Sequence, residues 1–200
     1  MKKLISSDIG EVNQKGTLQF SEDSYIITAG GKDIWGKKDE AHFAYCELEC
    51  DFDISVRIES LTMPDLYTKA GIMARETIDG GSKHVYILVF GDNSLRNNNN
   101  GGYELQYRDE IDGDSVATYP PVLDNEAPLF PVNFPNTWIR LQRIGNEFVS
   151  YYSENGVEWK EYGRHISTLK ENLLVGICVT AHSEQEPVKC KFSDLLIKRS

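Results

Sequence analysis

Apolar and polar residues alternate in short runs along most of this chain, with the period of two that is typical of β-strands. Between residues 50 and 58 the even positions are apolar and the odd positions are polar, and residues 137–143 repeat the alternation. No segment of convincing length has the period of an α-helix. The alternation predicts strands over residues 17–20, 24–29, 42–48, 50–59, 67–75, 83–90, 103–109, 137–143, 147–153, 173–181 and 188–197.

Residues that favour turns separate the predicted strands. The segments "AGGKD", "DGGSK", "RIGNE" and "SENGVE" supply Gly, Asn and Asp, which tolerate positive φ. This spacing predicts an all-β fold built as a two-sheet antiparallel sandwich. With 200 residues and 40% hydrophobic content, the chain suffices for a single domain over residues 1–200.

Two long loops interrupt the regular spacing. Residues 91–102 are rich in Asn, and residues 119–136 hold five of the seven prolines. A structureless loop of the second length is uncommon in a compact domain, so we expect it to border a ligand site.

The strand faces that point away from the predicted core carry planar and aromatic side chains. A solvated sheet face would more often carry Lys, Glu and Thr, whereas forked donors beside aromatic rings suit the hydroxyls and apolar faces of a sugar. A solvated face with cross-strand pairs remains the alternative. The residues on these faces include Arg75, His84, Tyr86, Gln106, Arg108, Trp138, Arg140 and His182.

The net charge of -10 changes the set of expected partners. Binding to nucleic acid phosphates needs clustered Lys and Arg, so the charge disfavours nucleic acid and favours a neutral, cationic or sugar-like partner. No apolar run approaches the length of a membrane span, and no apolar segment follows the two lysines near the start. We therefore expect a cytoplasmic protein, or an extracellular one if an export segment precedes this sequence.

The cysteines Cys46, Cys50, Cys178 and Cys190 do not match a metal-binding spacing. Cys46 and Cys50 on one strand would lie roughly 13 Å apart, which is too far for a disulfide. We expect buried thiols, no bound metal and no cofactor.

Several blocks of the chain resemble a known family when they are taken in order. They are "DIWG", "KAGIMARE", "GSKH", "ELQYR", "SENGVEW" and "VTAH". The succession is similar to concanavalin A-like lectin/glucanase domains, and in particular to an uncharacterised bacterial group of free-standing sandwiches, over roughly residues 8–197. The resemblance implies a jelly roll with a concave face. It also implies ligand contacts from Trp35, Arg75, Lys83, His84, Gln106, Arg108 and His182, but it fixes no activity.

The segment "EIDGD" contains alternating carboxylates, Glu110, Asp112 and Asp114, which are candidates for catalysis. Retaining glycosidases need two carboxyl groups about 5 to 5.5 Å apart. The "DGD" segment is also a strong turn signal, and we interpret it as a hairpin turn, with catalytic carboxylates or a calcium loop as the less favoured interpretations. Outside this segment, Glu76, Glu104 and His84 are the candidates for a catalytic role.

Two tryptophans have different interpretations. Trp159 in "SENGVEW" is predicted to pack behind a hairpin turn formed by Ser153 to Val157, whereas Trp35 fits a groove wall and a core position equally well. The sequence as a whole predicts a non-catalytic carbohydrate-binding protein. The alternatives are a glycoside hydrolase or lyase on the same fold, and an intracellular protein-interaction module.

Overall fold

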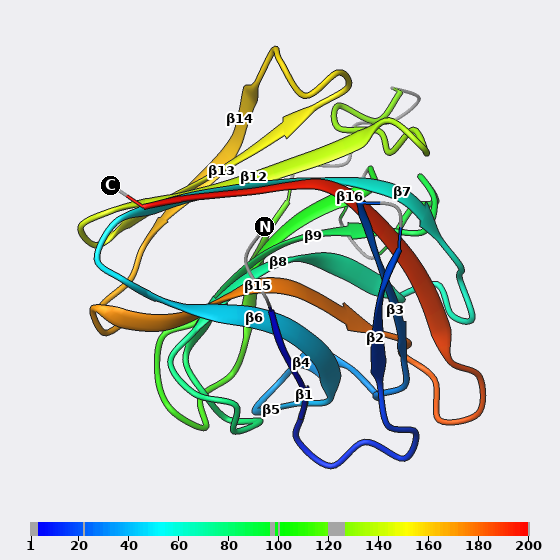
Figure 1. Cartoon of the computed structure of the whole chain (residues 1–200), viewed down its shortest axis with the longest axis horizontal. Helices are drawn as coiled ribbons and strands as arrows, with labels where there is room; N and C mark the ends of the chain where they lie inside the picture. Colours follow the sequence, from blue (N-terminus) through cyan, green and yellow to red (C-terminus); the bar gives the residue numbers. More distant parts are fainter. Residues whose placement is uncertain (1–3, 22, 97–98, 100, 120–126, 200) are drawn as a thin grey trace.

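Two antiparallel sheets form the body of the protein. A computed structural model describes residues 4–21, 23–96, 99, 101–119 and 127–199. The first sheet has seven strands in the order β1 (Ile5–Ile9), β6 (Ala41–Glu49), β15 (Asn172–Thr180), β8 (Lys69–Arg75), β9 (His84–Phe90), β10 (Tyr103–Arg108) and β11 (Val116–Thr118). Figure 1 shows these strands in one layer, with the second sheet above them.

The second sheet also has seven strands. Their order is β14 (Lys160–Ile166), β13 (Glu147–Ser153), β12 (Thr137–Ile144), β7 (Phe52–Leu61), β16 (Val188–Arg199), β3 (Ser24–Ala29) and β2 (Thr17–Ser21). A short hairpin of β4 (Ile34–Trp35) and β5 (Lys38–Asp39) stands apart from both sheets. The predicted all-β, two-sheet antiparallel sandwich is confirmed.

The hydrophobic core lies between the two sheets. The even-numbered residues of β7 from 52 to 58 point into it, and they meet alternate residues of β8, β9 and β15 from the other sheet. The residues that meet there include Phe52, Ile54, Val56, Ile58, Ile72, Ala74, Val85, Ile87, Val175 and Ile177. Burial of one face per strand is the physical cause of the alternation in the sequence.

The first sheet is buried on its other face as well. A second apolar cluster covers that outer face and includes Ile34 of the β4–β5 hairpin together with Phe43, Met73, Tyr86 and Leu88. All residues of β8 and β9 are consequently buried. This double burial explains why both parities are apolar between residues 84 and 90.

Every strand predicted from the alternation is present, with ends displaced by a few residues at most. The prediction for Cys50 is wrong, because Cys50 lies exposed in the turn before β7 with a φ of 60°. The alternation missed β4, β5 and β11, which are only two or three residues long, and β1 and β14, which lie at sheet edges.

The "DGD" segment forms the predicted turn between β10 and β11. The amide of Gly113 donates to the carbonyl oxygen of Glu110 at 3.0 Å, and Asp112 has a φ of 58°. The long loops also meet, because the side chain of Asn93 bonds both backbone groups of Val132, at 3.0 and 2.7 Å. Residues 97–98, 100 and 120–126 of these loops lie outside the described residues.

Candidate functional site

A pocket of about 310 Å³ opens on the outer face of the first sheet. Strand pairing sets its floor, since Lys69 at the start of β8 is paired with Phe90 at the end of β9, and the alternate residues Glu104 and Gln106 of β10 face the same side. Loops and the β4–β5 hairpin supply the walls. The lining residues are Asp33, Trp35, Tyr67, Lys69, Phe90, Arg96, Glu104, Gln106, Tyr119 and His182.

Aromatic rings form much of the pocket wall. Trp35 is 44% exposed and lies beside Lys69, whose Nζ is 5.8 Å from the centre of the indole ring. On another side, the ring of Tyr67 packs edge-to-face on Phe90 and lies 5.3 Å from the ring of His182. The pocket thus offers rings at several orientations around a polar floor. Of the two interpretations of Trp35, the structure supports the groove wall.

A chain of ionic contacts links Lys69, Asp33 and His182 along one side of the pocket. Lys69 is 3% exposed, and its Nζ donates to Asp33 Oδ1 at 2.5 Å and to the carbonyl oxygen of Ile34 at 3.2 Å. The other carboxylate oxygen of Asp33 lies 3.5 Å from His182 Nε2. His182 Nδ1 lies 2.7 Å from Asp65 Oδ1 but out of line for a hydrogen bond, so that contact is electrostatic.

These contacts shift the pKa values of two members of the chain. The hydrogen bond with Asp33 raises the pKa of His182 above its usual value, although partial burial opposes it. Burial alone would raise the pKa of Asp33, but contacts with His182 and Lys69 outweigh it and lower that pKa. Asp33 is therefore an anion that accepts a hydrogen bond from Lys69 and lies beside His182.

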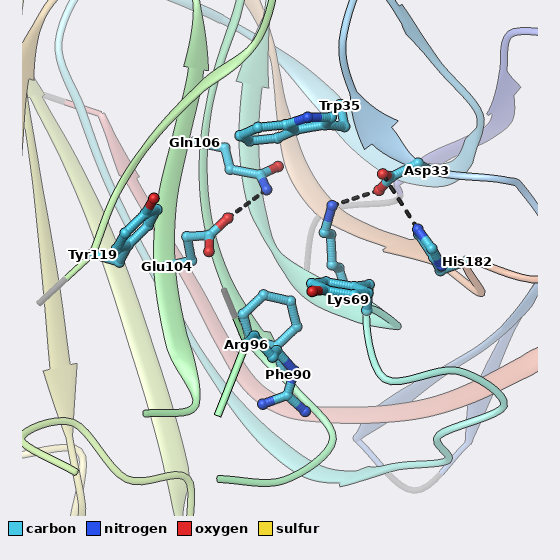
Figure 2. Close-up of a pocket in the computed structure, with 10 residues that line it drawn as sticks. Asp33, Trp35, Lys69, Phe90, Arg96, Glu104, Gln106, Tyr119 and His182 are labelled. Atoms are coloured by element: carbon cyan, nitrogen blue, oxygen red, sulfur yellow. Dashed lines mark hydrogen bonds and ion pairs between the residues drawn. The ribbon is translucent and has the colours of Figure 1, made fainter. Parts of the chain in front are cut away.

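The opposite side of the pocket carries Glu104 and Gln106. Glu104 is 7% exposed, and its two oxygens accept hydrogen bonds from Gln106 Nε2 at 2.6 Å and Asn99 Nδ2 at 3.2 Å. Burial raises the pKa of Glu104 above its usual value. Figure 2 shows this pair facing the Lys69–Asp33 pair across the space between Trp35 and Phe90.

Arg96 closes the pocket beneath Phe90. Its guanidinium lies 4.4 Å from the centre of the Phe90 ring and is 1% exposed. It pairs with the side chain of Asp92 and donates to the backbone oxygens of Leu66, Asp92 and Ser94. Arg96 thereby holds the 91–96 segment against the pocket.

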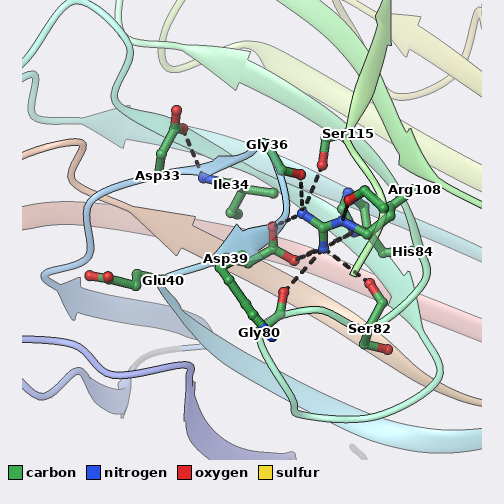
Figure 3. Close-up of polar contacts among 12 residues, drawn as sticks. Asp33, Ile34, Gly36, Asp39, Glu40, Gly80, Ser82, His84, Arg108 and Ser115 are labelled. Carbon is green, nitrogen blue, oxygen red and sulfur yellow. Dashed lines mark hydrogen bonds and ion pairs between the residues drawn. The ribbon is translucent and has the colours of Figure 1, made fainter. Parts of the chain in front are cut away.

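Three residues predicted to contact ligand lie instead in a buried charge cluster. Arg75, His84 and Arg108 are fully buried around Asp39, which is also fully buried. Figure 3 shows His84 and Arg108 beside Asp39. Arg108 donates to both carboxylate oxygens of Asp39, at 2.8 and 2.7 Å, while Arg75 Nη1 reaches it at 3.3 Å. The expectation of an open face here is corrected, because the β4–β5 hairpin and the 76–82 loop cover it.

The buried charge cluster also holds in place the β4–β5 hairpin, which forms part of the pocket wall. Arg108 donates to the carbonyl oxygens of Gly36, Gly80 and Gly113 as well as to Asp39. These bonds fasten the β4–β5 hairpin to β10, and the same hairpin carries Trp35 to the pocket wall. Burial lowers the pKa of His84 to about 4, so this imidazole is neutral at pH 7.

Two further residues predicted to contact ligand form hydrogen bonds with other residues of the protein instead. The buried hydroxyl of Tyr86 donates to the carbonyl oxygen of Cys178 at 3.0 Å. Lys83 Nζ donates to the carbonyl oxygen of Thr168 at 2.9 Å and lies 3.6 Å from Glu76. Neither residue lines the pocket.

Trp138 and Arg140 belong to the other sheet. They lie on the outer face of β12, where Arg140 forms a bidentate pair with Asp53 and Trp138 packs edge-to-face on Trp159 at 6.4 Å. The ring that lies against the turn at Gly156 is that of Trp138, and Trp159 packs on Trp138. The predicted ligand contacts are thus divided among the pocket, the buried cluster and this second face, apart from Lys83 and Tyr86, which lie in none of the three.

Of the catalytic candidates, the structure brings only Glu104 into the pocket. Glu110 is exposed in the turn after β10, and Glu76 pairs with Lys83 and Lys170. His84 is sealed in the cluster around Asp39.

The sequence-based search therefore found Trp35, Gln106, His182 and Glu104, and it missed the remaining lining residues. The missed set is Asp33, Tyr67, Lys69, Phe90, Arg96 and Tyr119. The alternation of β8 does place Tyr67 and Lys69 opposite Ala70 and Ile72, so a signal existed for these two. The others belong to loops or to a doubly buried strand, where alternation carries no information about faces.

The described residues include neither a candidate metal cluster nor a candidate membrane-spanning helix. No group of three or more His, Cys, Asp or Glu side chains among them is arranged to hold a metal ion. No helix in the described part of the chain is long and apolar enough to cross a membrane.

The fold is shared with proteins of solved structure. A functionally unknown protein from Saccharomyces cerevisiae superposes with a TM-score of 0.70 at 16% identity, over 99% of this chain and 97% of that one. The carbohydrate-binding module CBM66 from Bacillus subtilis gives 0.58 at 11% identity, over 97% and 95%. An alginate lyase from Klebsiella pneumoniae gives 0.54 at 9% identity, over 92% and 84%.

These similarities show a concanavalin A-like fold and, at such low identity, the fold alone. No protein-family description matches the sequence, and no curated protein matches it. Function therefore has to be argued from the pocket.

Proposed function

We propose that the protein binds carbohydrate without cleaving it, in the pocket on the outer face of the first sheet. The observation that carries the proposal is the combination of aromatic walls with a buried polar floor in one pocket. Aromatic rings accept the apolar faces of sugar rings, and buried carboxylate and amide groups orient hydroxyls. The carbohydrate-binding module among the similar structures adds support from the fold.

The size of the pocket suggests a short ligand segment. Its volume of about 310 Å³ is at the low end of the range of about 300 to 1,000 Å³ for ligand pockets. Among the described residues that line the pocket, Trp35 alone is exposed, so it would meet the ligand first. On the motif blocks in the sequence, we also propose the narrower membership in the bacterial group of free-standing sandwiches.

Replacing Trp35 tests the location of the site. A panel of glycans is screened with the unaltered protein, and any ligand found is measured by calorimetry on Trp35→Ala and on Trp138→Ala. We expect Trp35→Ala to weaken binding by about 10- to 100-fold, since a stacked aromatic ring is lost, and Trp138→Ala to leave it unchanged. Loss of binding in Trp138→Ala alone would move the site to the second sheet.

One observation favours hydrolysis as a second candidate. Asp33 and Glu104 line the same pocket with pKa values displaced in opposite directions, which is the arrangement of an acid and a base. Each oligosaccharide that binds is therefore incubated with the protein and analysed for shorter products by chromatography. Products that disappear with Glu104→Gln would establish an enzyme, whereas intact ligand supports binding alone.

The interaction-module alternative has its own outcome. A panel without any bound glycan, repeated at several pH values, would contradict carbohydrate binding and leave a protein partner as the leading candidate.

A further inference from the structure

The cationic groups of the pocket have few hydrogen atoms left for a ligand. Lys69 Nζ has three, and it donates to the Asp33 carboxylate and to the carbonyl oxygen of Ile34. Arg96 donates from Nε to the carbonyl oxygen of Leu66 and from Nη1 to the carbonyl oxygens of Asp92 and Ser94. Its Nη2 donates to the Asp92 carboxylate. Each cation is thus neutralised by an aspartate of this chain.

Hydrogen-bond acceptors, in contrast, are left open. Gln106 is 1% exposed, and its Oε1 has no donor among the residues that the structure describes. The amide cannot simply be reversed, because Nε2 donates to Glu104 Oε1 and an oxygen placed there would face a carboxylate oxygen. In Figure 2 the free oxygen points into the space beneath Trp35.

An open buried acceptor is costly until a ligand supplies a donor. A polar group cut off from water without a partner destabilises the unliganded state, and a hydroxyl that reaches it regains that loss on binding. A carboxylate or sulfate on the ligand would instead meet oxygen atoms of Gln106 and Glu104. Like charges brought together in a desolvated site oppose binding.

The balance of charges around the pocket also disfavours an anionic ligand. Asp33, Asp65, Asp92 and Glu104 lie on or against its wall, and they face Lys69, Arg96 and His182. With His182 protonated and Glu104 ionised, the four acidic groups exceed the three basic groups by one. The whole chain adds a net charge of -10.

We infer that the pocket selects an uncharged, hydroxyl-rich sugar and rejects glycans that carry carboxylate or sulfate groups. The inference rests on the proposed carbohydrate binding and specifies the ligand class of the same site. Gln106 and Glu104 are the residues that set this selectivity, by accepting hydrogen bonds from ligand hydroxyls.

Matched pairs of sugars test the inference. Oligomannose and oligomannuronate of equal length and linkage differ only in a hydroxymethyl or carboxylate group on each ring, and gluco- and galacto-configured pairs have the same design. Calorimetry on the full chain should show that the neutral member of a binding pair is held at least about tenfold more tightly than the uronate. Low salt is used, so that charge repulsion is unscreened.

Two variants that each remove one negative charge distinguish the effect of the pocket carboxylate from the effect of the net charge of the molecule. Glu104→Gln should weaken binding of the neutral sugar about tenfold and reduce its preference over the uronate to less than about threefold. Glu158→Gln, in the exposed turn between β13 and β14, should leave both values unchanged. An unchanged preference in Glu104→Gln would overturn the assigned role of this carboxylate.

The remaining outcomes distinguish the two proposals. If uronates bind as tightly as their neutral partners, the selectivity is refuted while carbohydrate binding stands. If no member of any pair binds, carbohydrate binding fails and the selectivity fails with it.

Discussion

At the scale of single residues, Asp39 balances more buried charge than any other side chain described. It faces two arginines and a neutral histidine, all fully buried. Removing Arg75 leaves Asp39 paired with Arg108, whereas removing the Asp39 charge leaves two guanidinium groups in the interior without a counterion. Buried charges that lose their partner are strongly destabilising.

We therefore expect Asp39→Asn to cost about 3 to 5 kcal/mol of stability. Arg75→Met should cost less, about 1 to 3 kcal/mol, mainly because the carbonyl oxygens of Thr77 and Asp79 lose their donor. Urea unfolding of both variants measures the two values. Equal costs, or a larger cost for Arg75→Met, would contradict the role assigned to Asp39.

His182 should make stability depend on pH. Its pKa is raised by Asp33, so its contribution is fully present below the unfolded value of about 6.5 and is lost as pH rises through the higher folded value. His84 acts in the opposite sense, because its pKa is lowered to about 4 and its contribution is lost as pH falls from about 6.5. A variant of one histidine is needed to separate the two.

The variant His182→Asn suits this purpose, since Asn tolerates the φ of 53° at this position. Thermal unfolding of both proteins is measured between about pH 5 and pH 9. The stability lost in the variant should be largest at low pH and should shrink as pH rises. A loss that grows with pH would contradict the contact with Asp33.

Sequence patterns located some site residues and misplaced others for one physical reason. Alternation correctly put Lys69 and Arg75 on the same side of β8, yet one lines a pocket and the other is sealed beneath a hairpin. A period of two shows which side chains lie on the same face of a sheet, but it does not show what packs over that face. The cover comes from β4 and β5, whose strands of two residues are too short to show a period.

At the scale of elements, the two hairpins of β12, β13 and β14 provide a matched test of turn geometry. Gly145 and Gly156 occupy the two turns with φ values of 61° and 71°. A Cβ on Gly145 would meet no described atom within 4 Å, whereas one on Gly156 would lie 2.8 Å from the ring of Trp138. Both substitutions carry backbone strain, and only the second also displaces a packed ring.

We expect Gly145→Ala to cost about 1 to 2 kcal/mol, the strain of a left-handed residue with a side chain. Gly156→Ala should cost about 1 kcal/mol more, because Trp138 must move from its contact with Trp159. Chemical denaturation of the two variants gives the difference. If Gly156→Ala is the milder change, the packing of Trp138 on this turn is not as described.

For strands with one buried face, the sequence predicted both the strand and the side that faces the core. For strands with two buried faces, it predicted the strand but not which side faces the core. The run over β9 is apolar at both parities, so its presence was evident while the side that faced the core was not. Edge strand β14 has the opposite problem, because both of its faces are largely exposed and leave no apolar period.

At the scale of the whole molecule, the two sheets share one hydrophobic cluster, so they should unfold together. The sequence predicted this architecture because its turn signals and apolar faces recur along the chain. It could not predict the pocket, which is assembled from β8, β9, β10 and segments far apart in sequence. A single cooperative transition is the expected consequence of the shared cluster.

The cysteines report on each sheet separately. Cys46 lies buried in β6 of the first sheet, Cys190 lies buried in β16 of the second, and Cys50 is exposed in a turn. All four cysteines are described, and none forms a disulfide in the structure. In native protein we expect one thiol to react rapidly with a labelling reagent, and Cys50→Ser should abolish that reaction.

With increasing denaturant, Cys46 and Cys190 should become reactive at the same concentration, because both thiols lie in the shared core and exposing either requires its loss. Mass spectrometry of labelled peptides follows the two sites in one sample, and the midpoint of the circular dichroism transition should coincide with both. Cys50, labelled throughout, controls for the reagent. Separate midpoints for Cys46 and Cys190 would mean that the two sheets unfold independently, and would refute a single domain over residues 1–200.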